Sequence, residues 1–239
     1  MSEQRKVSGE GFILHSYPYR ETSMLIDVFS RGHGRLSMVA RGAKRPRSSL
    51  RGVLLSFQPL LLAWYGRGEV RTLARAEWIG GLPLLRGEAL LCGFYLNELL
   101  LRLLPKEDPH EELFEQYRKA LERLAVAAPS APILRAFEKV LLKELGYALT
   151  LDRDVGSGRK IDPGGIYVYD PERGPLELDG AAGGEPRISG RTLMDLERDD
   201  FSNPVTLQEA KALMRMVIGL RLGSVELRSR RIFKELLEL

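Results

Sequence analysis

Residues Val39 to Gly52 read VARGAKRPRSSLRG and follow an alternating apolar run that starts at Leu36. This stretch contains no acidic residue and five basic ones: Arg41, Lys44, Arg45, Arg47 and Arg51. Gly42 and Pro46 interrupt any regular strand or helix, so we predict a loop, the basic loop (residues 41–52), at the end of a strand. From this stretch alone, two interpretations are open: a solvated surface loop or a binding site for a polyanion.

The distribution of charge along the chain favours the polyanion site. The first 80 of the 239 residues contain 13 Lys and Arg against 6 Asp and Glu, whereas the rest contain 23 against 26. The positive excess therefore lies in the first third of the chain. The single cysteine, Cys92, excludes an intramolecular disulfide, and no apolar run is long enough to span a membrane. We expect a cytoplasmic protein that makes no membrane contact.

The first 80 residues have the pattern of a small β-domain. Short apolar segments alternate with turn residues and predict strands at 12–15, 24–29, 35–41, 59–65 and 70–78. Five strands in about 70 residues fit a closed barrel such as the OB-fold, although an SH3-like barrel has a similar pattern. The basic loop lies in the longest connection, between the third and fourth strands.

The rest of the chain has a helical pattern. Apolar residues at three- and four-residue steps predict helices near 84–104, 110–126, 133–145, 190–199, 207–222 and 230–237. We expect Gly146 to end the third, and Ser189, Thr206 and Ser229 to cap the last three. Residues 146–188 are rich in Gly and Pro and predict an irregular insertion, with a hairpin at 166–169. The predicted fold class is α+β, with an OB-fold barrel over 1–80 and a helical domain over 81–239.

No pattern in the sequence predicts a catalytic site. The three histidines lie in separate contexts, without a neighbouring cysteine or carboxylate that would complete a catalytic motif. No glycine-rich loop of the phosphate-binding type precedes a Lys-Ser or Lys-Thr pair. We therefore expect a binding protein, rather than an enzyme, without a cofactor.

Several stretches resemble one family. The run SMVARGAKRPRSSLRGVLLSFQPLLL (37–62) and the following YGRGE (65–69) resemble the N-terminal barrel of the bacterial recombination mediator family RecO. The same order of matches continues through FIL (12–14) with ETS (21–23), YLNELL (95–100), and LRAFE (134–138) with LGY (145–147). The sequence of these stretches is most similar to the enterobacterial-like type of this family.

The resemblance implies a non-enzymatic mediator of DNA repair and recombination in the RecFOR pathway, associated with the nucleoid. Such a protein binds single- and double-stranded DNA, anneals complementary strands and, with RecR, helps load RecA onto SSB-coated single strands. Tyr17, Tyr19 and Tyr65 are candidates for stacking on bases or for covering the barrel ends. An OB-fold RNA-binding regulatory protein is the alternative. We expect phosphate contacts at Arg35, Arg41, Lys44, Arg45, Arg47, Arg51 and Arg71.

The resemblance also implies a groove for the acidic, apolar C-terminal tail of SSB. The expected tail-binding residues lie on the third helix: Leu134, Arg135, Phe137, Lys139 and Lys143. Arg135 matches the family's tail-binding arginine, although these cations would also suit the solvated face of an amphipathic helix. Many members bind zinc through two Cys-x-x-Cys pairs. Here Asp154 and Ser157 stand at the positions of the first pair and no cysteine follows, so we predict no metal.

Overall fold

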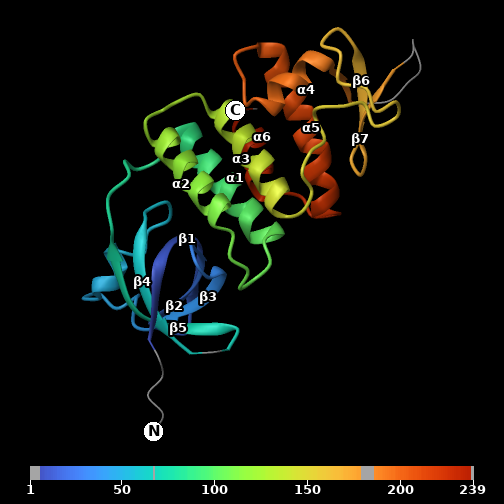
Figure 1. Ribbon diagram of the computed structural model, residues 1–239. Helices are drawn as coiled ribbons and strands as arrows, with labels where there is room; N and C mark the ends of the chain where they lie inside the picture. The colour runs from blue at the N-terminus through green and yellow to red at the C-terminus, as the bar shows by residue number, and fades with distance from the viewer. Residues whose placement is uncertain (1–5, 67, 179–185, 238–239) are drawn as a thin grey trace. The chain divides into compact units, whose positions relative to one another are not determined.

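The computed structural model describes residues 6–66, 68–178 and 186–237 (Figure 1). By their internal contacts, residues 1–130 and 226–239 form one compact unit, and residues 131–225 form a second. No helix within the described ranges is long and apolar enough to cross a membrane. The division into a barrel domain over 1–80 and a helical domain over 81–239 stays a prediction, because the contacts group two early helices and the last one with the barrel.

The first unit contains a closed five-stranded barrel, drawn in blue to cyan in Figure 1. The strands pair in the order β1-β2-β3-β5-β4, and β4 pairs back with β1. Only the β3–β5 pair is parallel. This closed barrel confirms the predicted α+β fold class and the OB-like barrel. Its strands are β1 (Val7–Tyr19), β2 (Ser23–Ser30), β3 (Gly34–Ala40), β4 (Leu60–Tyr65) and β5 (Val70–Trp78).

Strand β1 is longer than predicted because it serves two neighbours. Its first half, Val7 to Gly11, pairs with β4, and its second half pairs with β2. A Cβ at Gly11, where the two pairings meet, would lie 2.9 Å from the Val28 side chain. The alternation of apolar residues is weak in this strand because of its glycines and Glu10, so its full length is not visible in the sequence.

Helices α1 (Gly87–Leu103) and α2 (Glu111–Ala125) pack on the barrel within the first unit. A β-bulge shifts the β1–β2 register between Ile13 and His15, and the carbonyl of Leu14 accepts a hydrogen bond of 2.8 Å from the Asn97 amide. The Tyr117 hydroxyl donates to the Asn97 side-chain oxygen at 2.5 Å. Because all these groups are buried, breaking one link would leave polar atoms unsatisfied. The network therefore fixes both helices to the bulge.

The first unit ends with α6 (Arg228–Leu237), whose cap differs from the prediction. Ser229 lies inside the helix rather than before it. The Glu98 carboxylate of α1 accepts from the backbone N–H groups of Arg228 and Ser229, both at 2.9 Å. Burial alone would raise the pKa of Glu98, but the hydrogen bonds from Ser229 and Arg228 outweigh it and lower the pKa. A residue far away in the sequence thus takes the capping role.

The second unit combines helices with a small antiparallel sheet of order β7-β6-β8. The strands of this sheet lie in the second half of the segment that was predicted to be irregular, and the expected hairpin is its β6–β7 pair. The Gly146 backbone has a φ of +83°, as expected for a residue that ends a helix. The elements are α3 (Ser130–Glu144), β6 (Ile166–Asp170), β7 (Gly174–Glu177), β8 (Arg187–Ser189), α4 (Gly190–Glu197) and α5 (Pro204–Leu222).

Two of the three predicted caps are wrong, and one is confirmed. The Ser189 hydroxyl accepts from the Thr192 N–H at 3.2 Å and caps α4 as expected. Helix α5 starts earlier than predicted, with Asn203 as its cap and Pro204 in its first turn. Thr206 is buried instead, and its hydroxyl donates to Asp195 at 2.8 Å. The Asn-Pro pair is the stronger start signal because proline needs no N–H partner there.

Candidate nucleic-acid interface

The basic loop forms a compact series of turns after β3. The N–H of Arg45 donates to the Gly42 carbonyl at 3.0 Å, and the N–H of Ser48 donates to the Arg45 carbonyl at 3.0 Å. Residues Ser49–Gly52 then form a short 3₁₀ turn. Gly42 has a φ of +68°, which favours glycine, and Ala43 next to it is buried in the barrel core. The loop is therefore anchored at its start and folded along its length.

All five cations of the basic loop are exposed, and none forms an ion pair with a described residue. Because they lie within 11 consecutive residues of one folded loop, several can contact the same partner. An exposed cation without a carboxylate neighbour keeps its full attraction for an anion. The set is Arg41, Lys44, Arg45, Arg47 and Arg51.

Two predicted aromatic candidates lie beside the start of the basic loop. The N–H of Lys44 donates to the carbonyl of Thr22 at 2.9 Å, which ties the loop to the β1–β2 turn. Tyr17 and Tyr19 stand at the end of β1 next to this turn, and both are exposed. Tyr65 is only partly exposed, at the end of β4. The structure thus brings two of the three tyrosines to the loop.

Arg35 and Arg71, the other predicted phosphate contacts, have partners inside the first unit. The Arg35 Nε donates to the Leu104 carbonyl at 3.1 Å. The Arg71 guanidinium pairs with Glu107 at 3.0 Å and is largely buried. Both side chains tie the segment after α1 to the barrel. A phosphate contact by either stays a prediction, and it would compete with these interactions.

The predicted tail-binding residues of α3 are also engaged within their own unit. Arg135 forms an ion pair with Glu138 at 2.7 Å, and both side chains are buried. The Lys139 Nζ donates to the Leu196 carbonyl at 2.9 Å, at the C-terminal end of α4, and pairs with Asp199 at 2.5 Å. Phe137 is fully buried, whereas Lys143 is exposed. The predicted set is therefore spread over several environments.

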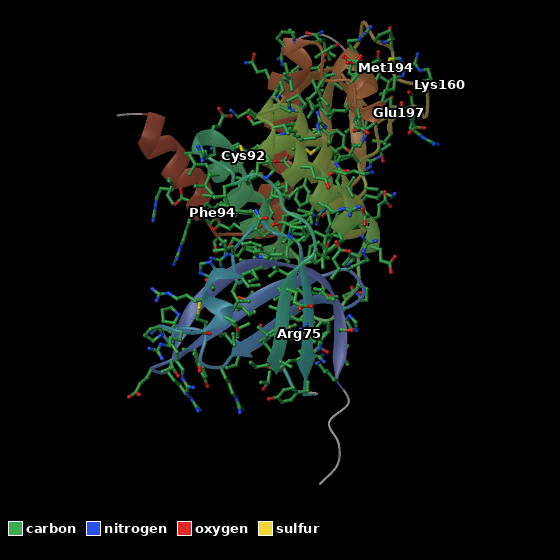
Figure 2. The ribbon with its side chains drawn as sticks, turned by 90° about the vertical axis from the view of Figure 1, so that its left-hand side faces the viewer. Arg75, Cys92, Phe94, Lys160, Met194 and Glu197 are labelled. Carbon is green, nitrogen blue, oxygen red and sulfur yellow. The ribbon has the colours of Figure 1, made fainter. Side chains whose placement is uncertain are left out.

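One cavity of about 260 Å³ in the second unit contains two of these predicted residues. Neither Arg135 nor Leu134 belongs to its wall. Sequence reasoning missed its apolar part, because that part lies in the segment treated as irregular, directly after α3. Figure 2 labels Glu197 on α4, whose carboxylate brings negative charge to the rim. The lining residues are Lys139, Lys143, Ala148, Leu149, Leu151, Asp152 and Glu197.

Asp154, which stands at the position of the first cysteine of the zinc-binding pairs in the sequence resemblance, organises the chain by hydrogen bonds. Its carboxylate accepts from the N–H groups of Gly156 at 3.1 Å, Ser157 at 2.8 Å and Glu177 at 3.2 Å, and from the Ser157 hydroxyl. The hydroxyl bond is the largest cause that lowers the pKa of Asp154 from 3.8 to about 2. No group of three or more metal-ligating side chains occurs among the residues that the structure describes.

Two family models together match nearly the whole chain. The N-terminal model of recombination protein O matches residues 1–82, and the C-terminal model matches residues 84–231. The chain belongs to the RecO family. The DNA repair protein RecO of Dechloromonas aromatica is 54% identical over 244 residues, which cover 100% of both chains. The RecO proteins of Aromatoleum aromaticum and an Azoarcus species are 53% and 51% identical, over 100% and 99% of both chains.

These matches confirm the resemblance seen in the sequence and extend it to the C-terminal half. They place the chain in a family of DNA repair proteins. Within this RecO chain, the basic loop combines exposure, unneutralised charge and neighbouring aromatic residues. We therefore regard it as the candidate nucleic-acid interface.

Proposed function

We propose that this RecO chain is a non-enzymatic mediator of DNA repair that binds single- and double-stranded DNA through the basic loop. The observation that carries the proposal is the set of five exposed cations without an acidic partner among the described residues. Each phosphate that they neutralise would release condensed counterions, so the affinity would fall steeply with salt. Contacts of this kind hold the backbone and do not read the bases.

Strand annealing follows from the same charge. A cationic surface that holds two strands reduces the repulsion between their phosphates, and complementarity then selects the product. No catalytic group is needed for this step. Following the family resemblance, we propose that the chain works with RecR and helps load RecA onto SSB-coated single strands.

We propose that the second unit receives the SSB tail. An acidic, apolar peptide needs a cation beside an apolar wall. The cavity that contains Lys139 and Lys143 has such a wall in Leu149 and Leu151. Arg135 remains a candidate through the family resemblance, but it would have to exchange Glu138 for the carboxylates of the tail.

The test is annealing of complementary strands coated with SSB, compared with bare strands and with strands coated by SSB without its tail. We expect acceleration in the first two cases and its loss in the third. No acceleration on bare strands would exclude the proposed DNA function. Equal acceleration with tailless SSB would exclude the tail site alone. RNA strands of the same sequence provide the comparison with the RNA-binding alternative, which a clear preference for RNA would favour.

A further inference from the structure

The indole of Trp78, at the end of β5, is the most exposed aromatic ring among the described residues, with 54% of Trp78 accessible. Tryptophan is highly buried on average, and the other tryptophan, Trp64, is 0% exposed in the barrel core. In the sequence, Trp78 appears as the last apolar residue of a strand, and nothing there distinguishes it from a core residue. Its exposure is a finding of the structure.

We propose that Trp78 is a base-stacking residue for single-stranded nucleic acid whose phosphates lie on the basic loop. This inference rests on the proposed DNA binding and adds to it a residue that contacts the bases. Single-strand binding surfaces combine a cationic track for the backbone with aromatic rings for the bases, and such stacking does not depend on sequence.

The indole ring of Trp78 is held in place by a hydrogen bond. The indole Nε1 donates a hydrogen bond of 3.0 Å to the carbonyl of Val53. The edge of the indole is therefore bound to the protein while more than half of the residue stays accessible. A ring that is already fixed loses little conformational entropy when a base stacks on it.

The hydrogen bond between Trp78 and Val53 lies at the end of the basic loop. Val53 directly follows the 3₁₀ turn, and its own N–H donates to the Leu50 carbonyl at 3.2 Å. Arg51, the last cation of the loop, is two residues from Val53, which limits the distance between their Cα atoms to about 7 Å. An exposed aromatic ring and an exposed cation without an ion pair among the described residues thus lie on the same part of the first unit.

Exposed apolar residues lie close to the indole. Ile79 follows Trp78 in the sequence and is 43% exposed. Leu55 is 38% exposed, and its N–H donates to the same Val53 carbonyl as the indole, at 2.8 Å. An apolar surface of this kind suits bases and does not suit phosphates. The nearest acidic residue along β5, Glu77, is ion-paired with Arg75, which Figure 2 labels on the barrel. Cations without a matching carboxylate favour a nucleic acid over a second protein surface as the occupant.

The positions of the aromatic residues also suggest the path of a bound single strand of nucleic acid. The basic loop starts where Lys44 bonds to the β1–β2 turn, beside Tyr17 and Tyr19, and ends where Val53 bonds to Trp78. Aromatic side chains therefore lie at both ends of the cationic track. A single strand that follows the loop would place bases at the tyrosines and at the tryptophan, with its phosphates between them.

Two variants separate stacking from the hydrogen bond. Trp78→Phe and Trp78→Ala both lack the indole N–H, and only Trp78→Ala lacks a ring. We expect the affinity for a dT oligonucleotide to fall about 5- to 100-fold in Trp78→Ala and to stay near that of the unchanged protein in Trp78→Phe. An abasic strand of equal length should bind the unchanged protein and Trp78→Ala equally.

Fluorescence gives an independent measurement, since the chain contains only two tryptophans and Trp64 is buried. Binding of the dT oligonucleotide to the full-length protein should change the emission, and this change should disappear in Trp78→Phe. The salt slope should be the same in Trp78→Ala as in the unchanged protein, because no phosphate contact is lost.

The outcomes distinguish this inference from the function on which it rests. If the unchanged protein binds neither oligonucleotide, both proposals fail. If it binds with a steep salt slope, but Trp78→Ala binds equally well and no emission change occurs, only the stacking role is overturned. An altered oligomeric state of Trp78→Ala with unchanged DNA affinity would show that the surface binds protein, and would also overturn it.

Discussion

The basic loop and helix α3 each present several cations, yet only those of the helix have partners of their own among the described residues. Arg135 on α3 pairs with Glu138, and Lys139 pairs with Asp199 and with the carbonyls that end α4. The cations of the loop form no ion pair with any described residue. A cation with an internal partner stabilises the fold, whereas one without a partner is available to a ligand. Local partners, rather than the number of basic residues, therefore distinguish cations that stabilise the fold from cations that are available to a ligand.

The largest effect should come from breaking the buried pair of α3. Arg135→Ala removes the cation of a buried ion pair, which should lower the free energy of unfolding by about 3–5 kcal/mol. Chemical denaturation measures this loss. The double variant Arg135→Met with Glu138→Leu should recover most of it, because two apolar groups replace the pair. A loss below about 1 kcal/mol in Arg135→Ala would contradict the structural role of the pair.

The folded double variant also tests the predicted contact with the SSB tail. If Arg135 holds the tail, this variant should not bind a tail peptide, although its affinity for bare DNA should be unchanged. Unchanged peptide binding would leave Arg135 as a structural residue only.

The next largest effect should be a loss of affinity for single-stranded DNA when cations of the basic loop are removed. Replacing Lys44, Arg45 and Arg47 by Ala should weaken single-strand binding on the order of 100-fold at 0.1 M salt and flatten the salt slope by about two units. Stability should hardly change, because these side chains form no ion pair with described residues. Arg173, Arg187 and Arg215, all exposed in the second unit, provide a control triple with the same change in charge. An equal effect of the two triples would mean that net charge, rather than the loop, drives binding.

The contrast between loop and helix also shows what could be predicted from the sequence. Strands β2 to β5 followed from alternation and turn residues, because one side of each faces the barrel core. The pair of Arg135 with Glu138 was not predicted, because the burial of these two side chains depends on tertiary packing. The cap by Glu98 and the hydrogen bond from the exposed Trp78 to Val53 each join residues that are far apart in the chain. No local pattern in the sequence therefore indicates either of them. Of the sheet after α3, only the hairpin at 166–169 was predicted, and β8 was missed because glycine and proline obscure the periodicity of short strands.

Asp154 differs from both the exposed cations of the basic loop and the ion-paired cations of α3. It is a buried anion that is satisfied by hydrogen bonds instead of by a cation or a metal. Its pKa is lowered from 3.8 to about 2 in the folded chain, so it contributes stability above about pH 4 that is lost as the pH falls to 2. Asp154→Asn should therefore lower the free energy of unfolding by about 2 kcal/mol at pH 7 and remove this part of the acid sensitivity. Denaturation at pH 7 and pH 3 measures both effects.

The control for Asp154 is Asp152→Asn. Asp152 is exposed, and a hydrogen bond from Arg153 lowers its pKa. Its replacement should have a much smaller effect, because water can solvate this carboxylate. If both variants behaved alike, the hydrogen-bonded carboxylate would not be what holds residues 154–158 to β7.

The smallest expected effect is a difference in stability between variants of the two cavity lysines, Lys139 and Lys143. Lys139→Met removes the cation at the C-terminal end of α4 and should lower the free energy of unfolding by about 1 kcal/mol. Lys143→Met removes the same charge from an exposed position, where solvent screens its interactions, so the loss of stability should be smaller, but binding of the SSB-tail peptide should weaken. Denaturation and peptide titration of the two variants measure this difference. An equal fall in stability in the two variants would mean that both lysines of α3 stabilise the fold. The contrast with the basic loop would then apply to every cation of the helix.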